Sequence, residues 1–128
     1  MNESGLSERL REISIENYIW VIYIGIIVLS YVSNYFEKEF LLYKNEFDKR
    51  RYRSIMITIF IVLVFVYFYF LYDSYKSYKS LDNNDSYKKK ELVILSLISS
   101  SLILLSGIIY LYIVLVDENV DVEIAFNW

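Results

Sequence analysis

The sequence contains no histidine, no cysteine and no proline, and its three glycines lie far apart. Without histidine or cysteine there is no Ser-His-Asp or Cys-His nucleophile, no imidazole or thiolate metal ligand and no disulfide. Scattered glycines do not form a loop that cradles phosphate. Only hydroxyl, lysine, arginine and carboxylate groups remain for chemistry, so we expect a protein that is not an enzyme and that has no metal and no cofactor.

The chain also lacks an excess of basic residues. Its 13 Lys and Arg against 16 Asp and Glu give a net charge of −3, and we expect no nucleic-acid partner because such a partner requires a basic face. Hydrophobic residues make up 56% of the sequence and charged residues 23%. The two kinds are segregated along the chain, which is typical of apolar segments joined by polar loops.

Three runs without any charged residue cover 17–36, 54–72 and 92–116. Each is about 20 residues long or longer, the length at which an α-helix crosses about 30 Å of hydrocarbon. The sequence therefore predicts an all-α, polytopic integral membrane protein with three transmembrane helices. The first run is the least apolar. A cleavable signal peptide fits it poorly, because several glutamates precede it and no small-residue cleavage site follows it.

We expect a single membrane domain whose helices extend into the loops. Its successive parts are the N-terminal tail 1–16, the first helix 17–36, a loop 37–53, the second helix 54–72, a loop 73–91, the third helix 92–116 and an acidic C-terminal tail 117–128. The best turn candidates are Asn45 and the segment 82–86. The Ser-Tyr-Lys repeat of 74–80 is expected to form one solvated helical face.

Both tails contain apolar residues. Leu6, Leu10 and Ile13 have helical spacing, which fits either a short amphipathic helix on the membrane surface or a partly ordered tail. At the other terminus, Phe126 and Trp128 are expected to dock at the membrane interface.

Small and polar residues recur inside the runs. Ser96, Ser100 and Gly107 lie near one face of the third helix, and small residues let helices approach closely while hydroxyls bond between them. We expect this face to pack against protein; the alternative is a hydroxyl-lined pore in an oligomer. On the first helix, Ser30, Ser33 and Asn34 form a polar patch near one end, where Asn34 is wetted.

Lys88, Lys89 and Lys90 directly precede the third run. They are candidate contacts for anionic lipid head groups, and the other interpretation is that they only anchor the topology. Three spans place the termini on opposite sides. The absence of basic residues after Val116 favours a cytoplasmic N-terminus and an external C-terminus. Lysine and arginine are almost evenly divided between the two sides, however, which is also typical of dual topology.

These observations favour a small non-enzymatic protein of the cell membrane that acts through helix–helix or partner contacts, in an accessory, regulatory or immunity-type role. Its partners would be the lipid bilayer and another membrane protein or itself. The alternative is an oligomeric pore or small transporter. In size and number of spans the chain resembles phage holins, which implies a pore; holins commonly end in a basic tail, whereas this tail is acidic.

Overall fold

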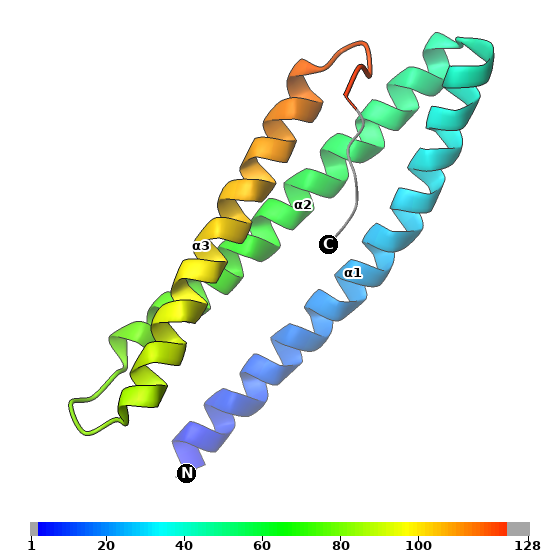
Figure 1. Cartoon of the computed structure of the whole chain (residues 1–128). Coiled ribbons are helices and arrows are strands. Elements are labelled where there is room, and N and C mark those ends of the chain that lie inside the picture. The colour runs from blue at the N-terminus through cyan, green and yellow to red at the C-terminus, as the bar shows by residue number, and fades with distance from the viewer. Residues whose placement is uncertain (1–2, 123–128) are drawn as a thin grey trace.

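The computed structural model describes residues 3–122, with side chains from Gly5 onward, and the regular elements in this part are α-helices (Figure 1). They are α1 (Glu3–Tyr43), α2 (Glu46–Lys79) and α3 (Tyr87–Val116). Each contains a stretch long and apolar enough to cross a membrane, and that of α1 is the least apolar. The prediction of an all-α chain with three such helices is confirmed, whereas membrane insertion stays a prediction.

The N-terminal tail is not a separate element. From Glu3 onward it is continuous with the helix of 17–36, rather than a surface helix or a partly ordered tail. Glu, Leu and Arg favour helix here and no proline interrupts it; Arg9 also pairs with Glu12 and Glu16, each at 3.4 Å. With 41 residues α1 is about 60 Å long, about twice the thickness of the hydrocarbon core.

The first turn centres on Asn45, as predicted. α1 ends at Tyr43, and Lys44 takes a left-handed conformation with φ 55°, from which its N–H donates to the Phe40 carbonyl at 2.7 Å. The Asn45 side chain then accepts the Phe47 N–H at 2.9 Å and caps α2. Because the cap satisfies a backbone donor that the helix leaves free, this two-residue connection suffices.

The second turn lies between α2 and α3, also as predicted. The Asp85 carboxylate accepts the Asp82 N–H at 2.7 Å, and the Ser86 hydroxyl accepts the Lys89 N–H at 3.1 Å as the cap of α3. Both α2 and α3 extend beyond their uncharged runs. With these two short turns, the three helices form two consecutive hairpins, in which α1 and α3 run antiparallel to α2 (Figure 1).

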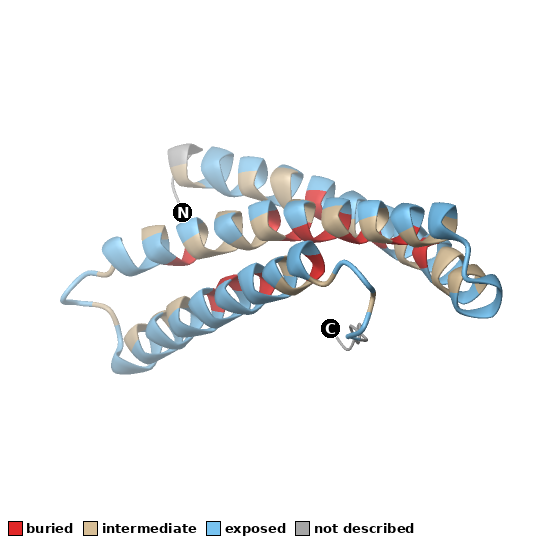
Figure 2. Ribbon diagram, turned by 90° about the horizontal axis from the view of Figure 1, so that it is seen from above, coloured by how far each residue is buried: buried red, intermediate tan, exposed pale blue. Residues whose placement is uncertain are grey.

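Buried and half-buried residues recur at spacings of three and four, which is typical of helices that pack side by side at a small angle. Figure 2 shows that they concentrate on α2 and on the sides of its neighbours that face it. On α1 the line consists of Ile19, Tyr23, Ile26, Ser30 and Ser33. On α3 it consists of Val93, Leu97, Ser100, Leu104, Gly107, Leu111 and Val114.

Two such lines run along α2, and each meets one neighbour. The line toward α1 consists of Tyr52, Met56, Ile59, Leu63, Val66, Phe70 and Asp73. The line toward α3 consists of Arg53, Phe60, Val64, Tyr67, Leu71 and Ser74. Met56, Ile59 and Leu63 are almost fully buried and form the centre of the core. Within the described residues, α1 and α3 both pack on α2 but not on each other.

The offset between these lines explains why α1 and α3 stay apart. The second line follows the first by one residue, which is a rotation of about 100° around α2. In a closed three-helix bundle, the directions from one helix axis to its two neighbours are about 60° apart. In a square four-helix bundle they are about 90° apart. At about 9 Å from α2, the axes of α1 and α3 are then about 14 Å apart, too far to pack. The described helices thus occupy three corners of a four-helix arrangement.

Residues 117–122 turn back over one end of this arrangement. The Asp117 carboxylate accepts the N–H groups of Asp121 at 2.9 Å and Val122 at 2.8 Å. Val120 packs against the core cluster that contains Tyr52. The expected docking of Phe126 and Trp128 lies outside the described residues.

Candidate functional site

Gly107 lies at a close approach of α3 to α2. A Cβ at this position would lie 2.9 Å from Cδ2 and 3.1 Å from Cε2 of Tyr67, and 3.6 Å from Cγ2 of Val64. Contacts below 3 Å between carbon atoms require the neighbour to move. The absence of a side chain at Gly107 therefore lets the Tyr67 ring lie directly against the α3 backbone.

The two serines of the predicted face lie two and three turns before Gly107 and meet a serine of α2. The Ser74 hydroxyl lies 2.8 Å from the Ser100 hydroxyl and 3.1 Å from that of Ser96. Ser74 and Ser100 are buried, whereas Ser96 is exposed. The structure therefore places Ser96, Ser100 and Gly107 on the side of α3 that faces α2.

The expectation that 74–80 forms one solvated face was wrong for Ser74. This residue is 8% exposed and belongs to the line on α2 that faces α3. Its position after Phe60, Val64, Tyr67 and Leu71, at alternating spacings of four and three, was the signal that could have identified it. The repeat of serine with tyrosine and lysine hid that signal, because three polar residue types in succession resemble a solvated helix end.

The polar patch predicted on α1 divides into a buried and an exposed part. Ser33 is completely buried; its hydroxyl donates to the Ser30 carbonyl at 2.9 Å and lies 3.6 Å from Sδ of Met56. Asn34 is exposed. Ser33 thus lets α1 approach α2 closely, in the same way as the small residues of α3 do on the other side.

Arg53 links the start of α2 to the end of α3. One guanidinium nitrogen donates to the carbonyls of Val114 at 3.4 Å and Leu115 at 3.3 Å, which have no partners within their own helix. A cation at a helix C-terminus also interacts favourably with the helix dipole. Backbone N–H groups, assisted by Arg53, lower the pKa of the Asp117 carboxyl from its ordinary value. Sequence reasoning counted Arg53 only as a loop charge.

Charged residues tie α1 to α2 at the opposite end. Lys76 pairs with Glu8 at 2.6 Å, which lowers the pKa of Glu8 and raises that of Lys76. One turn earlier on α2, burial raises the pKa of the Asp73 carboxyl, and the nearby Glu12 and Glu16 raise it further. The tail of α1 is therefore attached to α2 by one ion pair, while the charges of its glutamates oppose that of Asp73.

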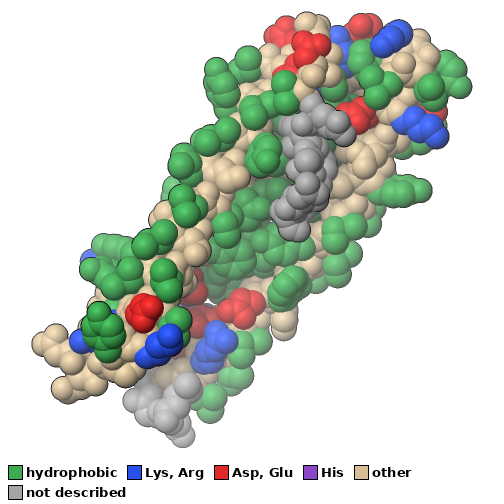
Figure 3. Space-filling model, viewed as in Figure 1, with side chains coloured by type: hydrophobic (Ala, Val, Ile, Leu, Met, Phe, Trp, Pro, Cys, Tyr) green, Lys and Arg blue, Asp and Glu red, His purple; other side chains and the backbone are tan. Residues whose placement is uncertain are grey.

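A concave face separates α1 from α3. Because both run antiparallel to α2, helix handedness places Trp20, Ile27 and Asn34 of α1, and Ser99 and Ser106 of α3, along the two borders of this face. All five are exposed. We call this face, with the half-buried Tyr67 at its floor, the open corner. In Figure 3 it is hollowed and largely hydrophobic between α3 and α1.

Polar groups line the open corner without internal partners. The side chains of Asn34, Ser99 and Ser106 form no hydrogen bond within the described part of the chain, unlike the Ser101 hydroxyl on the other flank of α3, which donates to the Leu97 carbonyl at 2.9 Å. In hydrocarbon, such groups gain from a hydrogen-bonding partner on a neighbouring helix.

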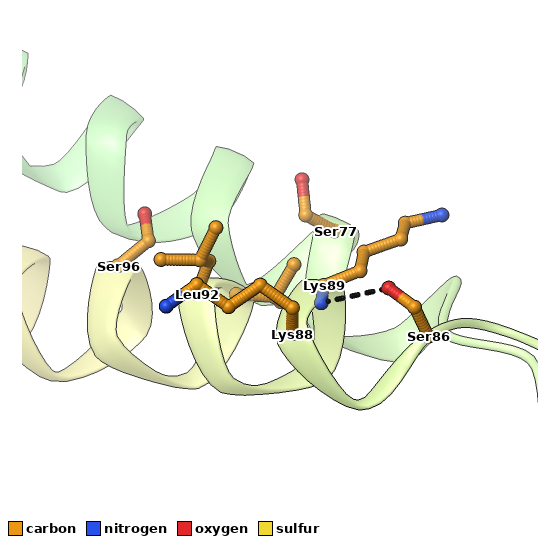
Figure 4. Close-up of a pocket in the computed structure, with 7 residues that line it drawn as sticks. Ser77, Ser86, Lys88, Lys89, Leu92 and Ser96 are labelled. Atoms are coloured by element: carbon orange, nitrogen blue, oxygen red, sulfur yellow. Dashed lines mark hydrogen bonds between the residues drawn. The ribbon is translucent and has the colours of Figure 1, made fainter.

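The three predicted lysines differ in their contacts. Lys89 pairs with Asp85 at 3.1 Å, and Lys90 donates to the Asn83 carbonyl at 3.4 Å. Lys88 has no ion pair or hydrogen bond among the described residues. Lys88 and Lys89, but not Lys90, line a shallow pocket of about 440 Å³ at the end of the open corner (Figure 4).

No group of three or more acidic, histidine or cysteine side chains that could hold a metal occurs in residues 3–122. What the site offers is therefore shape, hydroxyl and amide groups and one free lysine. No protein-family model matches the chain, and comparison with curated proteins and with solved structures gives no match either.

Proposed function

We propose that this chain is a small, non-enzymatic protein of the cell membrane that acts by binding a transmembrane helix of another membrane protein in the open corner. It would cross the membrane three times, with its N-terminus in the cytoplasm and its C-terminus outside. An accessory, regulatory or immunity-type role is the class of function that such binding serves. The separation of α1 from α3 carries this proposal.

The spacing of the helices supports a fourth helix as the ligand. The neighbours of α2 subtend about 100°, close to the right angle of a four-helix bundle, so one helix at the vacant corner would contact both α1 and α3. Asn34, Ser99 and Ser106 would supply hydrogen bonds, and Ile27 would supply packing. No charged residue lies in 17–36, 54–72 or 92–116, so the partner helix should itself be uncharged at mid-depth.

We favour a different protein over a second copy of this chain as the partner, because the open corner has room for one helix. A second copy would bring three helices that already pack together, and inserting one of them would require the other two to find room beside α1 or α3. A partner with a single span, or with one span at its periphery, meets no such obstacle.

Site-specific photocrosslinking tests the proposal in the native membrane. A photoreactive amino acid replaces Ser106, which borders the open corner, or Ser101, which lies on the other flank of the same helix and is the matched control. We expect one discrete heteromeric product from position 106 alone, and its loss when Ser99→Leu fills the corner. A product of twice the chain mass would indicate a second copy instead. Equal products from both positions, or none, would contradict the proposal.

The oligomeric pore is the second candidate, because the same unpartnered hydroxyls would line a polar path between copies. It predicts that induced expression collapses the membrane potential, and that Ser99→Ala with Ser106→Ala changes ion permeability. Helix binding predicts an unchanged potential.

A further inference from the structure

The pocket at the end of the open corner has an amphiphilic wall. It lies between the last turns of α2 and the first turns of α3 (Figure 4). Its wall consists of Ser77, Ser86, Lys88, Lys89, Leu92, Val93 and Ser96. From Lys88 to Ser96 the wall extends about 12 Å along α3, from the loop toward the apolar part of the bundle.

The polarity of this wall changes in one direction. The lysine positions lie nearest the loop, Leu92 and Val93 follow along the wall, and the hydroxyls of Ser77 and Ser96 flank them. A glycerophospholipid has the same order of groups, since its phosphate is followed by glycerol and ester oxygens and then by acyl chains. A free phosphate ion would leave the apolar part of the wall without a matching group.

Lys88 is the cation available to a ligand. Lys89 and Lys90 contact Asp85 and Asn83 in the loop, whereas Lys88 has no partner among the described residues. In Figure 4 the Lys88 side chain extends along α3 on the side of Leu92 and Ser96, and that of Lys89 points the other way. Because Lys88 is exposed and has no internal partner in the described part of the chain, its ammonium group is free to meet an anion in the pocket.

The hydroxyl cluster gives Ser96 a proton to donate. Each of the two contacts of Ser74 can have either hydroxyl as its donor. If Ser100 donates to Ser74 and Ser74 to Ser96, the Ser96 hydrogen points outward, and a chain of hydroxyls of this kind strengthens its terminal donor. The acceptor would be an oxygen in the pocket.

We propose that this pocket binds the head group of an anionic glycerophospholipid. Lys88 binds the phosphate, Ser96 and Ser77 donate hydrogen bonds to glycerol or ester oxygens, and one acyl chain lies along Leu92 and Val93. The lipid would occupy only the end of the open corner where α2 ends. This site needs no partner helix, so it stands or falls separately from the proposed function.

Native mass spectrometry of the purified full-length chain in neutral detergent tests the site. The chain is titrated with phosphatidylglycerol and, separately, with phosphatidylcholine. We expect phosphatidylglycerol to bind more tightly, because the choline cation of phosphatidylcholine offsets the charge of its phosphate. Lys88→Gln should weaken phosphatidylglycerol binding about tenfold, because a hydrogen bond to a charged group is lost, and should weaken phosphatidylcholine binding less. Ser96→Ala should weaken it about threefold.

Lys79→Gln is the matched control, since it removes the same charge at the same end of the bundle but outside the pocket, where Lys79 lies over the Tyr75 ring. It should change binding less than about twofold. Circular dichroism confirms that each variant keeps its helices. Equal binding of the two lipids, equal effects of Lys79→Gln and Lys88→Gln, or displacement of phosphatidylglycerol by inorganic phosphate at equal concentration would each overturn the proposal.

Discussion

Adding one methyl group at Gly107 should destabilise the protein although alanine favours helix. A Cβ there would lie 2.9 Å from the Tyr67 ring, so the ring or the α3 backbone must shift. Overpacking of this kind costs about 1–3 kcal/mol, and the better helix propensity of alanine offsets about 1 kcal/mol of it. We expect Gly107→Ala to lower the free energy of unfolding by about 0–2 kcal/mol, and Gly107→Leu to lower it by more.

Gly25→Ala is the matched control for the alanine variant. Apart from the chain neighbours and the backbone of its own helix, no atom lies within 4 Å of a Cβ at Gly25, so only the propensity gain of about 1 kcal/mol should appear. For the leucine variant the control is Ile109→Leu, which is exposed on the other side of α3. The assay is equilibrium unfolding in mixed detergent micelles, followed by circular dichroism.

A double-mutant cycle identifies the contact. Tyr67→Leu removes the ring that the new methyl group would meet, so Gly107→Ala should cost less in that background than in the wild type. Equal stability of Gly107→Ala and Gly25→Ala, or the absence of coupling to Tyr67, would refute the argument that Gly107 is required for close approach.

Four further predictions concern the ends of the helices, the charges and the topology. Arg53→Gln should lower the free energy of unfolding by about 1–2 kcal/mol through loss of the cap on α3, whereas Arg50→Gln should not, as measured in the same assay. Asp73→Asn should stabilise the protein at neutral pH; because the folded-state pKa of Asp73 is raised, the gain should shrink as pH falls through that pKa and vanish below its ordinary value, as measured by unfolding over a pH series. Ile61→Arg should prevent accumulation in membranes, because a mid-span arginine opposes insertion by about 2.5–3.5 kcal/mol, and immunoblots of carbonate-washed membranes would report unchanged levels if the second run does not span. A reporter fused after Trp128 should be active only if it works outside the cytoplasm; activity of both reporter types would indicate dual topology.

The number and place of the helices could be predicted because three uncharged, apolar runs of about 20 residues are separated by polar segments. Loss of charge over about 20 residues is a signal that needs no tertiary information. The turns at Asn45 and at 82–86 could also be predicted from the sequence, since capping depends on local residue types. The helical state of the α1 tail could not be predicted. A short polar helix is barely stable by itself, and its stability depends on the helix with which it is continuous.

There is a physical reason why the sequence does not predict which helices pack together. Within an apolar run, the residues that meet lipid and those that meet protein are equally hydrophobic, so periodicity carries little information. Ser100 and Gly107 stood out on α3 because they are small. Ser74 and Arg53 lie in polar surroundings, and only the position of α3 gives them their contacts.

The shared helix has a consequence for the order of assembly. α1 and α3 each contact α2 and not each other within the described residues, so the two interfaces can form as separate steps. α1, the least apolar of the three, is synthesised before α2 and can form its interface with α2 only once α2 has left the ribosome. A chain truncated after Lys79 would still contain a complete α1–α2 interface, whereas one that begins at Glu46 would contain a complete α2–α3 interface. The protein is therefore built as two overlapping hairpins, and each can be gained or lost during biogenesis without dismantling the other.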